Sequence, residues 1–394
     1  MESEYWFVLK QSVFVWEKGS DCYFYDSASF IGQRFVLEDS ETIRFVKAIA
    51  DIDNLYSLLL KQEELKTTGI QYIVEKLVDL GLAELINKRK ISEKPIQLPP
   101  ILNLQSDVHR LIDGTQTDMA VGENVLKNLL VLNIKLDSNA TPLFINKLVR
   151  MLDCLSHASL LELAVHGYSL SLSIPDTFWK QLEILPCLKR FVLSLDEGSC
   201  YLVEQLKERF SSRIIFDFDV TPAPDSQAIV EKLDKMEVDL NYNFRIFSEE
   251  DFSWTSKLID VYQIKKYQII PRNNGRNLDF FKSCIYVDEQ DILDSRQTKQ
   301  NIFAHQALNT NDFGKLTITT DGKVYANLHH RTIGSIDEDL RMLVYKEMSK
   351  GSSWLRVRDM SPCSKCIYQW LCPSPSDYEL EIGKPNLCHV VGNE

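Results

Sequence analysis

The sequence predicts a mixed α/β fold in three parts, on the strength of three observations. The hydrophobic period changes from strand-like to helix-like within the first 90 residues. Strand and helix patterns then alternate from residue 129 to about residue 300, which indicates parallel strands in a partial six-unit barrel or in an open doubly wound sheet. Four of the nine cysteines gather between positions 363 and 388, which indicates a metal-binding extension at the C-terminal end.

Residues 1–90 are expected to form a winged-helix-like domain. Four short runs rich in aromatic residues alternate in the manner of strands, at residues 5–10, 12–17, 22–26 and 33–38. Helical spacing of apolar residues follows in three places, at residues 43–50, 55–59 and 68–78. Gly81 stops the third helix, and residues 82–86 are expected to return as a strand.

Residues 91–128 are expected to be a connector, because Pro95, Pro99 and Pro100 interrupt any regular element. Six strand patterns follow within residues 129–300, at residues 129–136, 160–165, 190–195, 213–220, 239–247 and 267–271. Helical patterns separate most of them, at residues 142–155, 175–185, 200–210, 226–236 and 249–261. Six units are too few to close an eight-stranded barrel, so a partial (β/α)6 barrel or an open sheet is expected.

Residues 301–394 are expected to form a separate extension. Asp321-Gly322 lies between the strand patterns at residues 316–320 and 323–327, and this dipeptide is a strong signal for a two-residue hairpin. A helical pattern follows at residues 338–348, and the cysteine segment comes after it.

Composition restricts the partners and the compartment. The net charge of −12 and the lack of a long basic run argue against a nucleic-acid or anionic-membrane partner. No stretch of 18 apolar residues and no signal peptide occur, so the chain is expected in the cytoplasm. An odd number of cysteines suits free thiols and one metal site better than a disulfide framework.

The four clustered cysteines are the predicted metal ligands. Cys363, Cys366, Cys372 and Cys388 are spaced Cys-x2-Cys-x5-Cys-x15-Cys. Thiolates are soft ligands, so four of them predict one [4Fe–4S] cluster, with a zinc ion or unligated thiols as the alternatives. Either metal would hold this segment folded. The other five cysteines are expected to be core residues.

The C-terminal segment resembles the SPASM extension of peptide-modifying radical SAM enzymes. The resemblance rests on the Asp321-Gly322 hairpin, on Gly334 and on the run from Cys363 to Cys372. Those enzymes place a six-unit barrel before the extension, and many begin with a winged-helix element that binds the leader of a precursor peptide. The phrases at residues 372–379 and 384–389 are most similar to pseudo-radical-SAM proteins of Bacteroidales-type peptide-modification systems.

The barrel departs from the pattern of the catalytic members. They carry Cys-x3-Cys-x2-Cys after the first barrel strand, whereas residues 137–144 contain no cysteine and the motif occurs nowhere in this sequence. Their Gly-Gly-Glu is replaced by His166-Gly167-Tyr168-Ser169. The resemblance therefore implies that this chain uses no S-adenosylmethionine and performs no radical chemistry. We expect His166 to be structural, because no second ligand or nucleophile pairs with it.

The extension also departs from the full SPASM pattern. Residues 323–327 lack the early cysteine, and Ser376 stands at the position of the fourth cysteine of the run. The resemblance therefore implies that one auxiliary cluster is lost. The other keeps its four ligands, with Cys388 as the last of them.

These features predict a non-catalytic accessory or scaffold protein in the maturation of a ribosomally synthesised peptide. The resemblance implies that it binds the precursor leader and pairs with a catalytically complete radical SAM/SPASM enzyme. The leader would add to the edge of the third strand, beside Tyr23 and Tyr25, and would contact Ile73, Lys76 and Leu77 of the third helix. No catalytic residue is predicted. An electron-transfer iron–sulfur subunit and an enzyme with non-radical chemistry in the barrel are the alternatives.

Overall fold

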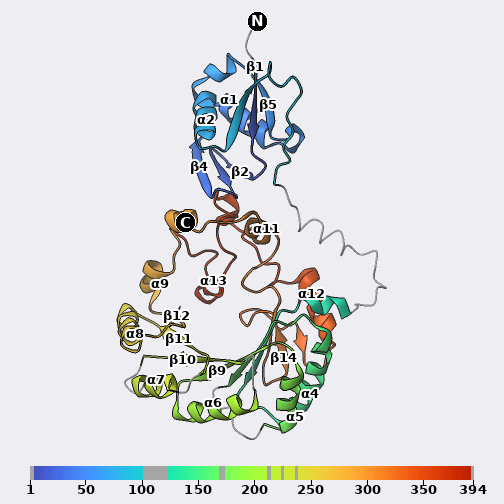
Figure 1. The fold of residues 1–394 in the computed structure, drawn as a ribbon, viewed down its shortest axis with the longest axis vertical. Helices are drawn as coiled ribbons and strands as arrows, with labels where there is room; N and C mark the ends of the chain where they lie inside the picture. Colours follow the sequence, from blue (N-terminus) through green and yellow to red (C-terminus); the bar gives the residue numbers. More distant parts are fainter. Residues whose placement is uncertain are drawn as a thin grey trace.

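The computed structural model describes residues 4–100, 123–167, 174–210, 214–222, 226–235 and 238–391. An N-terminal unit lies at one end, a large sheet with its helices lies at the other, and C-terminal residues lie between them (Figure 1). Residues 101–122 of the predicted connector fall outside the described residues, as do Tyr168 and Ser169. No helix among the described residues is long and apolar enough to cross a membrane.

The N-terminal unit contains two antiparallel sheets of three strands each. The first has the order β5-β1-β6, and its strands are β1 (Glu4–Leu9), β5 (Ser57–Lys61) and β6 (Ala83–Asn87). The second has the order β2-β3-β4, and its strands are β2 (Val13–Lys18), β3 (Asp21–Asp26) and β4 (Ile31–Val36). The four predicted N-terminal strands and the returning strand are thus all confirmed, each shifted by one or two residues.

Two α-helices cover these sheets. Helix α1 (Ser40–Ala50) begins where the side chain of Asp39 accepts hydrogen bonds from the amides of Glu41 and Thr42. Helix α2 (Thr68–Asp79) ends before Gly81, whose φ of +69° is favourable only for glycine and allows the chain to reverse into β6. The helices bury their apolar faces in one core with residues of both sheets, including Phe7, Phe24 and Phe45.

The prediction of a helix at residues 55–59 is wrong. These residues contribute to β5, where Leu58 pairs with Phe7 and Leu60 pairs with Tyr5 of β1. The flanking single turns are η1 (Ile52–Asn54) and η2 (Glu64–Lys66). Leucines at positions 55, 58 and 59 match a helical period, but pairing with β1 decides the structure of so short a run.

The large sheet has nine strands in the order β12-β11-β10-β9-β8-β7-β13-β14-β15. Strands β7 to β12 are parallel and follow the order of the sequence. Their bounds are β7 (Val131–Leu136), β8 (Glu162–Gly167), β9 (Leu188–Ser194), β10 (Ile214–Val220), β11 (Leu240–Ile246) and β12 (Tyr267–Pro271). The predicted strand–helix alternation is therefore confirmed as a mixed α/β fold with a mostly parallel sheet.

A helix follows each of the first five parallel strands. These helices are α4 (Pro142–Asp153), α5 (Asp176–Ile184), α6 (Glu197–Arg209), α7 (Ser226–Asp234) and α8 (Glu249–Tyr262). They lie along the outer side of the sheet in Figure 1. Alternate strand residues such as Ile134, Phe191 and Phe218 pack with helix residues in the largest core of the protein. The other face of the sheet carries polar side chains.

The predicted hairpin is present, but it belongs to the large sheet. Strand β13 (Lys315–Ile318) pairs in parallel with β7 and antiparallel with β14 (Lys323–Tyr325), which in turn pairs with β15 (Gly334–Ser335). Shorter helices complete the chain: α9 (Leu278–Cys284), α10 (Glu289–Asp294), α11 (Lys299–Ala307), α12 (Leu340–Lys350) and α13 (Asp377–Ile382). The predicted boundary near residue 300 is therefore not a boundary of the sheet.

Candidate metal centre

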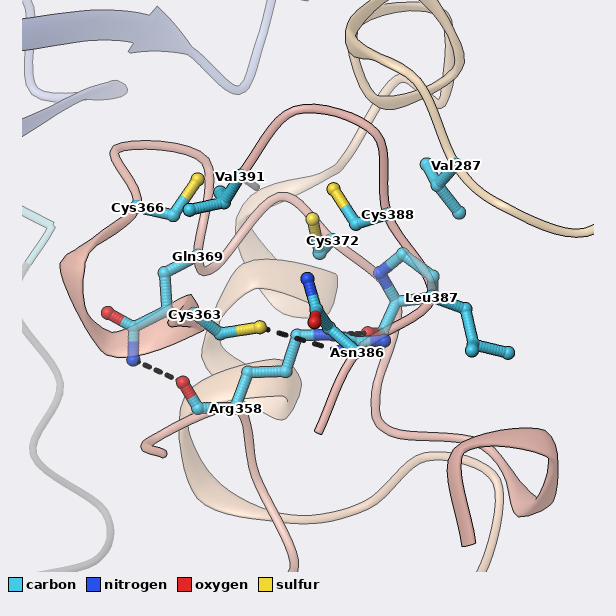
Figure 2. Close-up of a pocket in the computed structure, with 11 residues that line it drawn as sticks. Val287, Arg358, Cys363, Cys366, Gln369, Cys372, Asn386, Leu387, Cys388 and Val391 are labelled. Carbon is cyan, nitrogen blue, oxygen red and sulfur yellow. Dashed lines mark hydrogen bonds between the residues drawn. The ribbon is translucent and has the colours of Figure 1, made fainter. Parts of the chain in front are cut away.

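The four predicted metal ligands line one small pocket in the C-terminal segment. Cys363 begins the single turn η5 (Cys363–Lys365), Cys366 directly follows that turn, and the amide of Cys372 donates to the carbonyl oxygen of Tyr368. Cys388 is held by a parallel bridge to Val287, whose amide donates to the carbonyl oxygen of Leu387 at 3.1 Å. All four thiols border the same cavity (Figure 2).

The thiols influence one another electrostatically. Burial is the main cause that raises the pKa of Cys372 to about 12; Arg358 opposes this shift, and the other three thiolates add to it. Burial likewise raises the pKa values of Cys363 and Cys366, and Cys388 adds to both shifts. The neutral forms of Cys363, Cys366 and Cys372 are therefore favoured when no metal is bound. A bound cation would displace their protons, as expected for thiolate ligation.

The side chains do not yet converge as ligands of one ion. Among the described residues, no group of three or more His, Cys, Asp and Glu side chains is arranged to hold a metal ion. A tetrahedral zinc with Zn–S bonds of about 2.3 Å requires sulfurs roughly 4 Å apart, so zinc requires these thiols to move together. The cavity is about 20 Å³, close to the space one water needs, so a cluster requires the loops to open.

Two polar side chains at the pocket suit a sulfur-ligated metal. Asn386 is 1% exposed, and neither its amide nitrogen nor its amide oxygen has a hydrogen-bond partner among the described residues. Figure 2 shows its amide beside the thiols of Cys372 and Cys388. A buried amide without a partner costs free energy, and a thiolate or sulfide would accept a hydrogen bond from its N–H group.

Arg358 supplies positive charge to the pocket. One terminal nitrogen of its guanidinium lies 3.8 Å from Cys363 Sγ, and the other donates to Glu379 Oε1 at 2.9 Å. Its side chain is only 11% exposed. A four-thiolate metal centre carries net negative charge, which this guanidinium would offset. The residue types at the pocket therefore suit a thiolate-bound metal, whose binding would require the thiols and loops to rearrange. A cluster bound here would supply structural support or electron relay.

We compared the chain with known proteins. No family model matches the sequence, and no curated protein matches it. Among solved structures, one match is a heterocyclase in complex with substrate and cofactor, with 9% sequence identity and a TM-score of 0.15. The alignment covers 65% of this chain and 34% of that chain, so this protein spans about a third of the heterocyclase. A likeness this weak carries no argument about fold or function.

Residues 323–327 and Ser376, the two places where the resemblance led us to expect a cysteine, lie close together. Asn327 follows β14, and its Nδ2 donates to Asp312 Oδ1 at 3.0 Å and to Asp377 Oδ1 at 2.5 Å. Ser376 begins α13, and its hydroxyl donates to Glu379 Oε2 at 2.7 Å. The hydrogen bond from Asn327 to Asp377 thus joins the segment after β14 to the start of α13.

Asp312 gives this junction a pH dependence. Burial and the nearby Asp377 raise its pKa to about 6. The folded state therefore binds more protons than the unfolded state between about pH 4 and pH 6, and stability falls as the pH rises through this window.

We compare the unfolding free energy of Asp312→Asn with that of the wild type at each pH. We expect this difference to shift in favour of the variant by about 1–3 kcal/mol from about pH 4.5 to about pH 7.5. Urea unfolding of both proteins at the two pH values measures this difference. Asp279→Asn, at a 97% exposed side chain, is the control. A difference that is the same at both pH values would contradict the shifted pKa.

The five isolated cysteines divide into two groups. Cys22, Cys187 and Cys200 are buried, as predicted. Cys154 and Cys284 are exposed, so the prediction that they are core residues is wrong. Cys154 opens the turn η4 (Cys154–His157) after α4, and Cys284 ends α9. Each lies at the end of a helix, where its side chain is not covered by a neighbouring element.

The aromatic face of β2 and β3 packs against the cysteine segment. Tyr23 and Tyr25 are each 3% exposed. The Tyr23 ring lies 5.1 Å from the Tyr368 ring, and Tyr25 Oη donates to the carbonyl oxygen of Gln297 at 2.9 Å. We name the buried residues here the docking cluster, and they are Phe14, Tyr23, Tyr25, Ile292, Ile302, Ile367, Tyr368 and Leu371. Tyr23 and Tyr25, which were predicted to contact a leader peptide, thus contact other residues of this chain instead.

The prediction that the third strand, β3, lies at the edge of its sheet is wrong. Strand β3 lies in the centre of its sheet, paired with β2 on one side and with β4 on the other. Ile73 and Leu77 of α2 are 2% and 0% exposed in the N-terminal core, so they do not line an open groove. Lys76 is half-buried. Alternating aromatic residues identify a strand, but they do not show which strand is outermost.

Arg358 and Asn386 were not predicted as parts of the site. Arg358 lies five residues before Cys363, and Asn386 lies two residues before Cys388. Polar residues this close to metal ligands are a weak signal in the sequence, because neighbours of ligands often support them.

Proposed function

We propose that this chain is a non-catalytic accessory protein in the maturation of a ribosomally synthesised peptide. It binds the precursor leader through a winged-helix-like N-terminal domain. It pairs with a catalytically complete radical SAM/SPASM enzyme through its degenerate partial barrel and SPASM-like extension. Its one [4Fe–4S] cluster, or alternatively one zinc ion, is held by Cys363, Cys366, Cys372 and Cys388 and has a structural role.

The placement of the thiols carries this proposal. Loops that follow parallel strands lie at the carboxyl edge of a sheet, where ligands of such folds bind. The loop after β7 contains no cysteine, and Cys154 lies in the return connection at the opposite edge. The four thiols that share a pocket are in the C-terminal segment instead. The loop after β7, where the catalytic enzymes hold their open-iron cluster, therefore supplies no thiolate.

Strand β4 is the surface that suits an extended peptide best. Among the described residues it is an edge strand, paired with β3 on one side. The amide of Leu37 donates to the carbonyl oxygen of Ser20, so by antiparallel alternation the amides of Gly32, Arg34 and Val36 point away from β3. Val36 is 60% exposed, and Tyr72 of α2 is 59% exposed beside this sheet. Main-chain groups and apolar side chains are thus both available for strand addition.

Val36→Pro tests this surface. The substitution removes an outward N–H group from an edge position without removing a bond to β3. We expect affinity for the cognate precursor peptide to fall about tenfold or more, because the loss of one ladder hydrogen bond is joined by steric exclusion. Fluorescence anisotropy with a labelled precursor measures the affinity.

Val36→Ala is the matched control, because it shortens the side chain and keeps the N–H group. Unchanged binding by Val36→Pro, in a protein that keeps its secondary structure by circular dichroism, would rule out leader addition to β4. Point substitution is sharper than deletion of residues 1–90, because deletion would also uncover the docking cluster.

A further inference from the structure

The face of the large sheet opposite helices α4–α8 is lined with charge. Along each parallel strand, apolar residues face the helical core and the alternate residues face the other way. The charged members of this second set are Lys135, Glu162, His166, Arg190, Asp217, Asp219 and Arg245. Several of these charged side chains are partly buried. A buried charge costs free energy unless it is paired, so these charges need partners.

The charges near the amino ends of the strands are satisfied. Arg190 donates to Glu162 Oε1 at 2.8 Å and to Asp217 Oδ1 at 2.8 Å. Asn241 Nδ2 donates to the same Asp217 oxygen at 2.9 Å. One guanidinium, two carboxylates and an amide thus form a closed set of hydrogen bonds. This half of the face offers no excess positive charge.

The carboxyl ends of the strands are different. Lys135 and His166 are register partners on β7 and β8. Arg245 lies near the end of β11 and pairs with Asp219, while Arg272 directly follows β12. Among the described residues, neither Lys135 nor Arg272 forms an ion pair. Three cations and a histidine therefore lie on this half of the face, and among the described residues Asp219 is the carboxylate that forms an ion pair with one of them, Arg245.

The cations are close enough to repel one another. Burial lowers the pKa of Lys135, and repulsion from Arg245 and Arg272 lowers it further, with Asp219 opposing the shift. Burial lowers the pKa of His166 to about 4, assisted by Lys135 and Arg245 and opposed by Asp219 and Glu162. Half-buried cations without counter-charges are unfavourable, and an anion among them would remove that cost.

We propose that Lys135, His166, Arg245 and Arg272 form a binding site for a small oxyanion, a carboxylate or a phosphate group. Guanidinium groups bind both chemistries through paired N–H donors, and a lysine ammonium adds a point charge. The position agrees with the rule that ligands of parallel sheets bind beyond the carboxyl ends of the strands. The inference is independent of the four-thiol pocket and of peptide binding to β4.

The side chain of His166 reports on this site. Its Nε2 lies 3.3 Å from Asn133 Oδ1, and it lies next to Lys135 on the neighbouring strand. A bound anion would favour the imidazolium form and raise the pKa of His166. The full-length protein with ¹³C-labelled histidine is titrated with inorganic phosphate and, separately, with acetate, each at constant ionic strength against chloride. The His166 signal is assigned by its loss in His166→Gln.

We expect saturable movement of the His166 signal and a rise of about one unit or more in its pKa with at least one of the two anions. Movement with phosphate alone identifies a phosphate site, and movement with acetate alone identifies a carboxylate site. Lys135→Met and Arg272→Gln should each weaken the anion at least about fivefold, as loss of one charged partner predicts. Both remove a repelled cation, so neither removes a favourable ion pair.

Lys180→Met is the control, because Lys180 pairs with Asp176 on the exposed surface of α5. It should leave the response of His166 unchanged. A His166 signal that responds to phosphate and acetate no more than to chloride would overturn the proposal. Equal anion affinity in Lys135→Met, Arg272→Gln and the wild type would overturn it as well.

Discussion

Cys372→Ser is expected to remove the bound metal and to unfold the C-terminal segment. A serine hydroxyl does not replace a thiolate on a soft metal, and the pocket around Cys372 has no spare sulfur. Structural thiolate sites contribute on the order of 10 kcal/mol to folding, and the packing of Ile367, Tyr368 and Leu371 in the docking cluster is the main apolar contact that would remain. We expect iron, or zinc, to fall from a stoichiometric amount to less than about a tenth per chain, as the loss of one of four ligands predicts.

Metal analysis and the visible spectrum of anaerobically purified protein measure this loss. Broad visible absorption identifies an iron–sulfur cluster, whereas a colourless protein with one zinc identifies the alternative. Cys154→Ser is the matched control, because Cys154 is exposed at the end of α4 and does not line the pocket. Full metal content in Cys372→Ser would show that this thiol is not a ligand.

Tyr368→Ala is expected to detach the N-terminal unit from the rest of the protein. Tyr368 is 1% exposed, its ring packs edge-on against Tyr23, and its hydroxyl donates to Glu289. Truncation of a buried aromatic side chain costs about 3–5 kcal/mol, and here the loss falls on a contact between two units. We expect the described part of the connector, residues 91–100, to become much more sensitive to limited proteolysis.

The Cys372→Ser variant tests whether metal binding supports the docking of the N-terminal unit. Cys366 and Cys372 bracket Ile367, Tyr368 and Leu371, so the ligands and the docking cluster share one short segment. Cys372→Ser should therefore also increase proteolysis of the connector. Tyr201→Ala, at a 58% exposed side chain on α6, should leave it unchanged. A connector that stays resistant in Tyr368→Ala would show that docking does not depend on this ring.

Periodicity was enough to predict most of the elements. Strands with apolar residues on one face and helices with an apolar stripe differ in period, so the alternation of β7 to α8 could be read directly. Residues 55–59 were misassigned because five residues fit either period, and the pairing of β5 with β1 is a long-range contact. Likewise, nothing local in residues 315–318 indicates that β13 would pair with β7.

The candidate site could be predicted in part for similar reasons. Four cysteines at short spacings identify possible ligands, because their chemistry is specific. The contributions of Arg358 and Asn386 depend on how the loops turn, which residue types alone do not specify. The contacts of Tyr23 with Tyr368 and of Tyr25 with Gln297 join segments more than 250 positions apart, so no local pattern reveals them.

The pairing of β13 with β7 ties the end of the chain to its middle. Residues 301–394 cannot be treated as an appendage that folds by itself, since their hairpin completes one flank of the parallel sheet. A fragment that stops near residue 300 would leave the main-chain groups of β7 open to solvent and to other molecules. Such a fragment would self-associate through that flank, so shortened versions of this protein are best designed to retain residues 315–335.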